Sequence, residues 1–112
     1  MHFLKTDLTT SQDLSAGALS YTTSIGRKKK LERIHFHSSV AITESITITL
    51  DSAQGANYDV VLRKKDLSSE QDYVYIPDQE CNLQSGDEIK IQCTNANLTG
   101  SIYATLKFSE LP

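Results

Sequence analysis

Alternating apolar and polar residues, with a period of two, form the strongest pattern along the chain. In Ser45–Leu50 an Ile or Leu alternates with a Ser or Thr, and Asp87–Cys93 and Ser101–Phe108 repeat the alternation. Successive side chains of a β-strand point to opposite faces of a sheet, so each segment predicts a strand with one buried and one solvated face. The residues expected to point inward are Ile46, Ile48, Leu50, Ile89, Ile91, Cys93, Ile102, Ala104, Leu106 and Phe108.

Weaker strand signals lie in segments rich in β-branched and aromatic residues, which suit a pleated, half-buried surface. Turn residues separate them: Gly55, Gly86 and the loop Asn95–Gly100 interrupt the alternation. No useful window has apolar residues at helical spacing, so helix content is expected to be low. The segments are Ala18–Ile25, Leu31–His37, Tyr58–Arg63 and Asp72–Pro77, with Phe3–Lys5 and Glu80–Leu83 as short edge candidates.

These elements predict an all-β protein, an antiparallel β-sandwich of about eight short strands. Two-sheet jelly rolls are the usual eight-strand solution, and a seven-stranded immunoglobulin-like sandwich is the alternative. The chain contains no Trp, which disfavours the immunoglobulin-like arrangement. The sequence therefore favours a jelly-roll-like sandwich.

The beginning of the chain has a different character. Thr6–Gly17 is rich in Thr, Ser and Asp, and its leucines, Leu8 and Leu14, are too widely spaced to indicate a strand or a helix. We interpret residues 1–17 as an N-terminal arm or linker and residues 18–112 as a single sandwich domain. An arm of this kind gains order chiefly by packing on another subunit.

Length and composition are consistent with one soluble domain. The chain has 112 residues, of which 38% are hydrophobic and 22% charged, enough for one core and typical of globular proteins. No apolar run approaches the roughly 20 residues of a transmembrane helix, and Met1–Thr10 lacks the features of a secretory signal. We therefore expect a protein made without export, with no membrane partner.

Basic and acidic residues are distributed unevenly. Eight of the eleven basic residues fall in two stretches, and eight of the fourteen acidic residues lie at or beyond Asp66. The folded surface is therefore expected to carry opposed patches, which suit a protein partner better than nucleic acid. The alternative interpretation is a solvated turn flanked by lysines. The two stretches are Arg27, Lys28, Lys29, Lys30 and Arg33, followed by Arg63, Lys64 and Lys65.

Two cysteines and three histidines offer little for a metal or disulfide site. Cys81 and Cys93 lack a CxxC spacing or a nearby His cluster, and we expect buried free thiols, with a disulfide between neighbouring strands as the alternative. His35 and His37 share one strand face but lack a third ligand, so a polar face opposite buried Ile34 and Phe36 is preferred over a metal site. No cofactor is implied.

The motifs of common enzymes are missing from the sequence. Paired carboxylates occur, as at Asp87 and Glu88, but no aromatic sugar platform accompanies them, and no Gly-x-Ser-x-Gly elbow or phosphate-binding Gly-rich loop is present. We expect no enzymatic activity. Tyr73 and Tyr75 are partner-binding candidates because tyrosine offers a large amphipathic contact area. They form either an exposed stripe or an inward pair with hydroxyls at the rim.

The second half of the chain resembles a known class of virion protein. Asp72–Pro77, Ser85–Ile91, Thr94-Asn95 and Gly100–Phe108 are similar to the corresponding part of small jelly-roll capsid decoration, or cement, proteins of tailed bacteriophages. The resemblance covers roughly Ser45–Phe108, and no functional residue is carried over from it. The basic residues Arg27–Lys30 have no counterpart there, which leaves the attachment surface open.

The resemblance implies a structural protein that clips neighbouring capsid subunits together on the outside of the shell. Its partner would be the major capsid protein, its location the virion, and it is expected to form a homo-oligomer. The alternative function is a carbohydrate- or receptor-binding module such as a tail-fibre tip. The candidate contact residues are Arg27, Lys28, Lys29, Lys30, Arg33, Tyr73 and Tyr75.

Overall fold

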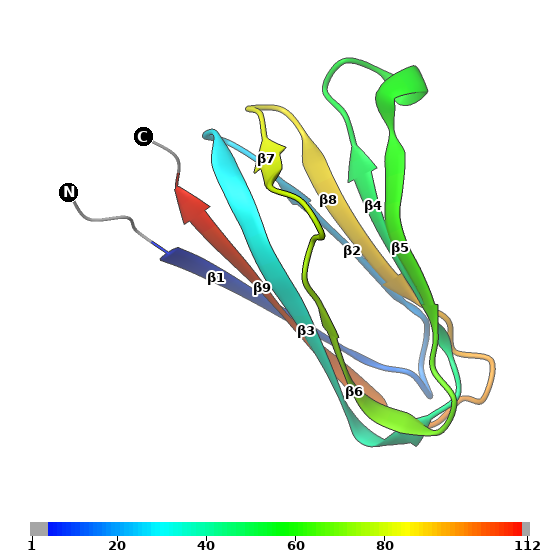
Figure 1. Cartoon of the computed structure of the whole chain (residues 1–112). Coiled ribbons are helices and arrows are strands. Elements are labelled where there is room, and N and C mark those ends of the chain that lie inside the picture. Colours follow the sequence, from blue (N-terminus) through cyan, green and yellow to red (C-terminus); the bar gives the residue numbers. More distant parts are fainter. Residues whose placement is uncertain (1–4, 111–112) are drawn as a thin grey trace.

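Two antiparallel β-sheets face each other in a computed structural model that describes residues 5–110 (Figure 1). A single 3-10 turn, Ala56–Tyr58, is the helical element of the described residues. Within that part of the chain, no helix is long and apolar enough to cross a membrane. The strands are β1 (Lys5–Asp13), β2 (Leu19–Ser24), β3 (Lys29–Ile42), β4 (Ser45–Asp51), β5 (Val60–Asp66), β6 (Glu70–Tyr75), β7 (Cys81–Leu83), β8 (Glu88–Cys93) and β9 (Ser101–Glu110).

The order of the strands is that of a jelly roll. The first sheet runs β1-β9-β3-β6, with β7 also pairing with β3, and the second runs β2-β8-β4-β5. The chain crosses from one sheet to the other at every connection except those between β4 and β5 and between β6 and β7. This crossing pattern folds two Greek keys around one core. The predicted all-β, jelly-roll-like sandwich is confirmed.

The period-two alternation fills the space between the sheets. Ile46, Ile48, Ile89 and Ile91 of the second sheet are buried, opposite Ile102, Ala104, Leu106 and Phe108 of the first. Phe36 and Phe108 are the largest fully buried side chains. Fully burying a side chain of this kind stabilises the fold by about 1.5–3 kcal/mol relative to leaving it in water. The alternation is therefore the main source of stability.

The N-terminal segment is a strand and not an arm, as far as the structure describes it. Lys5–Asp13 pairs with β9 over its whole length, from Lys5 opposite Ser109 to Asp13 opposite Ser101. Leu8 and Leu14 are six positions apart, an even number, so both point inward in an extended chain. Leu14 is fully buried and Leu8 packs against the core. Residues 1–4 of the predicted arm lie outside the described residues.

Two buried carboxylates tie loops together at opposite ends of the sandwich. Glu44 accepts hydrogen bonds from the backbone N–H groups of Ala96 and Asn97, each at 2.9 Å. Asp87 accepts hydrogen bonds from the backbone N–H groups of Ala53 and Gln84, also at 2.9 Å. Buried N–H groups in loops need such partners because no strand satisfies them.

Candidate partner-binding surface

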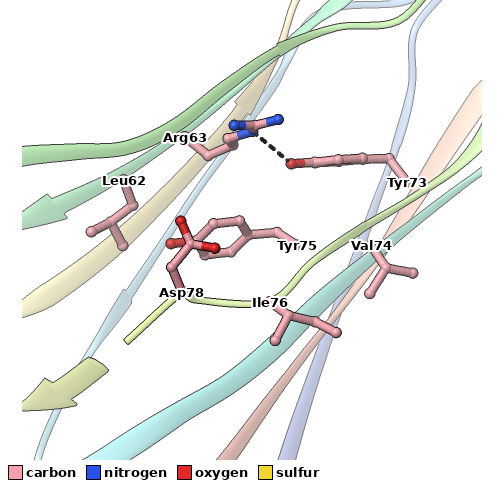
Figure 2. Close-up of a pocket in the computed structure, with 7 residues that line it drawn as sticks. All are labelled: Leu62, Arg63, Tyr73, Val74, Tyr75, Ile76 and Asp78. Carbon is pink, nitrogen blue, oxygen red and sulfur yellow. Dashed lines mark hydrogen bonds between the residues drawn. The ribbon is translucent and has the colours of Figure 1, made fainter. Parts of the chain in front are cut away.

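The end of the edge strand β6, together with Ile76 after it, is apolar on both faces. Tyr73 and Tyr75 are half-buried and pack against the core, where Tyr73 stacks on Phe36 with ring centres 6.1 Å apart. Val74 and Ile76 point the other way and are exposed, Val74 at 45% and Ile76 at 62% (Figure 2). The tyrosines therefore form the inward pair with hydroxyls at the rim, and the apolar residues offered to a partner are Val74 and Ile76.

Three shallow hollows meet at Ile76, and together with Val74 they form what we call the Ile76 surface. The first hollow, about 310 Å³, lies between β5 and β6 (Figure 2). The second, about 250 Å³, follows the segment after β6, and the third, about 350 Å³, lies on the outer face of the first sheet. The first hollow is lined by Leu62, Arg63, Tyr73, Val74, Tyr75, Ile76 and Asp78. The second is lined by Lys30, Leu31, Glu32, Ile76, Pro77, Asp78, Gln79 and Glu80. The third is lined by Glu32, Arg33, Ile76 and Lys107.

The backbone explains why the surface is hollowed there. Along β3, the pairing partner changes from β6 to β7. The last pair with β6 is Ile34 with Tyr75, and the first pair with β7 is Leu31 with Cys81. The segment between β6 and β7 contains Pro77, which has no N–H to donate to a ladder. The ladder of β3 with β9 also shifts register between Leu31 and Arg33. A break in sheet pairing therefore leaves Ile76 without a strand across it.

Cationic side chains border the apolar residues. Arg33 is exposed and lies opposite Lys107 of β9 in the ladder. On the other side of β6, the Arg63 Nε donates a hydrogen bond of 3.1 Å to the Tyr73 hydroxyl, and the Lys65 ammonium lies 6.0 Å from the Tyr73 ring centre. Acidic side chains line the same hollows, namely Glu32, Asp78 and Glu80. An apolar centre with a border of both charges suits a protein partner whose rim carries complementary charges.

The predicted basic stretch divides into parts with different surroundings. Arg27 and Lys28 are exposed in the turn before β3. Lys29 is half-buried with its ammonium 5.6 Å from the Phe108 ring centre, and Lys30 lies 3.8 Å from the Glu80 carboxylate. Of the five predicted residues, Lys30 and Arg33 line the hollows at Ile76. The stretch is therefore not one patch.

A pair of histidines lies next to Val74 on the outer face of the first sheet. His35 is opposite Val74 in the ladder, and His37 is opposite Asp72. Asp72 Oδ1 lies 2.9 Å from His37 Nδ1 and 3.2 Å from His35 Nε2. Hydrogen bonding to His37, and then to His35, lowers the pKa of Asp72. Sequence spacing missed this carboxylate because it comes from the neighbouring strand.

The predicted polar face of β3 is confirmed, since Ile34 and Phe36 are buried between the exposed histidines. Among the described residues, no group of three or more His, Cys, Asp or Glu side chains is arranged to hold a metal ion. Cys93 is buried and Cys81 half-buried, and both are free thiols.

Acidic side chains gather at the far end of the second sheet. Asp51 of β4 lies opposite Glu88 of β8. The pKa of Asp51 is raised, first by the negative charge of Asp59 and also by that of Glu88. The second sheet thus has an acidic end, whereas the border of the Ile76 surface carries both charges.

One feature of the sequence indicates the Ile76 surface. Tyr73, Val74, Tyr75 and Ile76 are four consecutive residues with large apolar parts, so whichever face is buried, the other face stays apolar. Lys107 carried no such signal, because only the β3–β9 pairing places it beside Arg33.

Comparisons with known proteins give no family. No protein-family model matches the chain, and no curated protein matches it. Among solved structures it is similar to the Drosophila NLP core, whose structure provides insight into pentamer formation and histone binding, with 10% identity, coverage of 90% of this chain and 95% of that one, and a TM-score of 0.45. It is also similar to a serine protease of Aeromonas sobria, with 13% identity and a TM-score of 0.39, covering 96% of this chain and 27% of that one.

A viral protein is a third neighbour. The structure of infectious bursal disease virus, Gx strain, matches with 14% identity and a TM-score of 0.36, covering 96% of this chain and 31% of that one. The chain therefore spans about a third or less of the protease and virus chains. All three likenesses are too weak to carry a functional argument, so function rests on the chain's own surface.

Proposed function

We propose that this chain is a structural protein of a virus particle that decorates the capsid and binds the major capsid protein through the Ile76 surface. In this role it holds neighbouring capsid subunits together through the contacts that it makes with them. Jelly rolls are a recurrent architecture of capsid proteins, which makes the fold compatible with this role. A fold alone does not assign a function, so the proposal depends on the surface.

The observation that carries the proposal is the exposure of Ile76 at the junction of three hollows bordered by Arg33 and Lys30. A large exposed apolar side chain set among charged residues is typical of a contact centre that becomes desolvated when a partner binds. The charged border would meet complementary charges on the rim of the capsid subunit, which speeds association and sets orientation.

The first test asks whether the chain belongs to a particle. Purified virus particles from the source organism are analysed by quantitative mass spectrometry, and the proposal expects this chain at a fixed ratio to the major capsid protein. The second test adds purified chain to particles stripped of it and measures cosedimentation. A chain that is absent from particles and does not cosediment with them would overturn the proposal.

A matched pair of variants locates the contact. Ile76→Asp places a charge at the centre of the Ile76 surface, whereas Val61→Asp places one on β5 at a similar exposure, 59% against 62%. Neither position is in the core, so both variants are expected to fold. Ile76→Asp is expected to weaken cosedimentation by at least about tenfold, the effect of losing one central apolar contact. Equal binding by both variants would remove the Ile76 surface from the proposal.

A second candidate function is carbohydrate or receptor binding, as in a tail-fibre tip, and one observation favours it. Tyr103 is exposed on the outer face of the first sheet, where a hollow of about 350 Å³ is also lined by hydroxyl groups of Thr9, Ser11 and Thr105. An aromatic ring beside hydroxyls can stack on a sugar and bond to its oxygens. Binding to a glycan array that Tyr103→Ala abolishes, without particle binding, would favour this candidate.

A further inference from the structure

The two sides of the sandwich differ in how their edge strands are protected. On one side, the ladder of β5 shifts register opposite Ile48 and Thr49, and β5 carries Arg63, Lys64 and Lys65. In the other sheet on that side, β6 ends before Pro77, and β7 has three residues. Bulges, lysines, prolines and short strands are the devices by which proteins prevent edge strands from pairing with other chains.

On the opposite side, β1 carries charged residues only toward its ends, at Lys5, Asp7 and Asp13, and within the described residues it has neither a bulge nor a proline. β1 is nine residues long and pairs with β9 without a register shift. Its central stretch, Leu8–Gln12, contains no charged residue and no proline. A long, regular edge strand with an uncharged centre is a ready template for a further strand. This asymmetry indicates that the β1 edge has a partner.

The backbone groups that β1 offers are set by its pairing with β9. The Leu14 N–H donates to the Gly100 carbonyl at 2.9 Å, and the register continues unbroken toward Lys5. Backbone groups of alternate residues point to opposite edges of a strand, so even-numbered residues bond to β9 and odd-numbered residues face the open edge. The Asp13 carbonyl agrees, since it accepts from Ala16 and Gly17 and not from β9.

We propose that β1 pairs with β1 of a second copy of this chain, antiparallel, about a two-fold axis at Thr9. In this register Thr9 lies opposite the Thr9 of the second copy, and residues 7 and 11 lie opposite each other. Odd-numbered residues, which face the open edge, then meet odd-numbered residues, as a hydrogen-bonded antiparallel pair requires. The first sheets of the two copies become one continuous sheet.

The charged residues of β1 favour this register, and they favour a second copy of the chain as the partner. Centring the pair on Thr9 places position 5, a lysine, opposite position 13, an aspartate, at both ends of the interface. A shift of the axis to Thr10 places Asp7 opposite Asp13, and like charges directly opposite each other are destabilising. The register centred on Thr9 therefore brings opposite charges of β1 together at both ends, which suits an isologous dimer. The dimer does not depend on the proposed capsid role.

The first test blocks the open edge without touching the β1–β9 ladder. Thr9→Pro removes an N–H that faces the open edge and is expected to raise the dimer dissociation constant at least about tenfold. Lys64→Pro is the matched control. The Leu67 N–H donates to the backbone carbonyl of Glu44, which precedes β4, so by alternation the Lys64 N–H faces the open edge of β5. The measurement is sedimentation equilibrium of the full chain over a range of concentrations, with circular dichroism as a check on folding.

The second test reverses the end charges. Lys5→Glu and Asp13→Lys are each expected to weaken the dimer roughly tenfold, because each puts like charges opposite each other at both ends. The double variant, Lys5→Glu with Asp13→Lys, restores opposite charges and is expected to recover the parent's dissociation constant within about threefold. A parent that stays monomeric, equal effects of Thr9→Pro and Lys64→Pro, or a double variant as weak as the single ones would each overturn the proposal.

The outcome is separable from that of the capsid proposal. Dimerisation is measured on the purified chain alone, whereas the capsid proposal is measured on particles. A dimer that does not bind particles would leave the β1 interface standing, and a monomer that binds particles would leave the Ile76 surface standing.

Discussion

The Glu44 carboxylate accepts a hydrogen bond from the Asn97 backbone N–H at 2.9 Å, across 53 residues of sequence. The Thr94 hydroxyl and the Ala96 N–H also donate to it, and the Glu44 side chain is almost fully buried. One carboxylate thus holds the β8–β9 loop against the start of β4. The loop has no strand to satisfy these donors, so the position of Glu44 fixes that end of the sandwich.

Replacing Glu44 tests this role. Glu44→Gln keeps one acceptor oxygen but turns an NH₂ group toward donors, so buried N–H groups lose their partner. We expect a loss of about 1–3 kcal/mol in the free energy of unfolding. Urea unfolding at pH 7 measures it. The exposed Glu80→Gln serves as control, with an expected change within about 0.5–1 kcal/mol, since a surface ion pair contributes little.

The Glu44 contribution should also depend on pH. Burial raises the pKa of Glu44, but hydrogen bonds from Asn97, Thr94 and Ala96 outweigh it, and the pKa is lowered below its ordinary value of 4.5. A lowered pKa in the folded state stabilises the fold above 4.5, and the contribution is lost as pH falls through the folded value. The stability gap between parent and Glu44→Gln is therefore expected to narrow between pH 5 and pH 3. A gap that is constant over this range would contradict the hydrogen-bond account.

Gly100 is a second position at which the backbone conformation restricts the residue type. Its φ is +81°, and a Cβ there would lie 2.9 Å from Val40 Cγ2. Gly100→Ala is expected to lower the free energy of unfolding by about 1–3 kcal/mol through strain and this contact. At Gly26 a Cβ would meet no atom within 4 Å, so Gly26→Ala should change stability by less than about 1 kcal/mol. Thermal unfolding of both variants provides the comparison.

The two thiols should differ in reactivity. Burial raises the pKa of Cys93 to about 12, and it raises the pKa of the half-buried Cys81 as well. Because the thiolate is the reactive form, Cys93 should react with a disulfide reagent at pH 8 only when the protein unfolds. Labelling kinetics of Cys81→Ser and Cys93→Ala separate the two. Rapid labelling of Cys93 in the folded protein would show that it is accessible.

The sequence predicted the parts of the fold that depend on local alternation. Ile46, Ile48, Ile89 and Ile91 are buried as expected, because burial of one strand face imposes a period of two on the residue types. β1 was missed because polar residues, Thr10 and Gln12, fill its inward positions between Leu8 and Leu14. These positions lie at the margin of the sandwich, where an apolar residue is not required.

The candidate surface was predicted less well, for a reason that lies in pairing. Which residues of β6, β3 and β9 stand side by side is set by the ladder and not by sequence distance. Arg33 was expected to act with Arg27 and Lys28, yet its neighbours are Ile76 and Lys107. Of the two arrangements expected for Tyr73 and Tyr75, the structure has the inward pair with hydroxyls at the rim.

The basic residues provide the last prediction, because their surroundings predict different effects from the same charge reversal. Arg27 and Lys28 are exposed in a turn, so the double variant Arg27→Glu with Lys28→Glu should change the free energy of unfolding by less than about 0.5 kcal/mol. Lys29→Glu replaces a cation 5.6 Å from the Phe108 ring centre with an anion, which the negative ring face disfavours. We expect it to lower the free energy of unfolding by about 1 kcal/mol.

The same variants separate two surfaces in the particle-binding assay. If the Ile76 surface contacts the capsid subunit, Arg33→Glu should weaken attachment and reduce its dependence on salt, because Arg33 lines a hollow at Ile76. The turn variant should slow association slightly and leave dissociation unchanged, as charges remote from a contact do. Association and dissociation rates measured at two salt concentrations distinguish these results. A turn variant that dissociates faster than Arg33→Glu would move the contact from the Ile76 surface to the turn between β2 and β3.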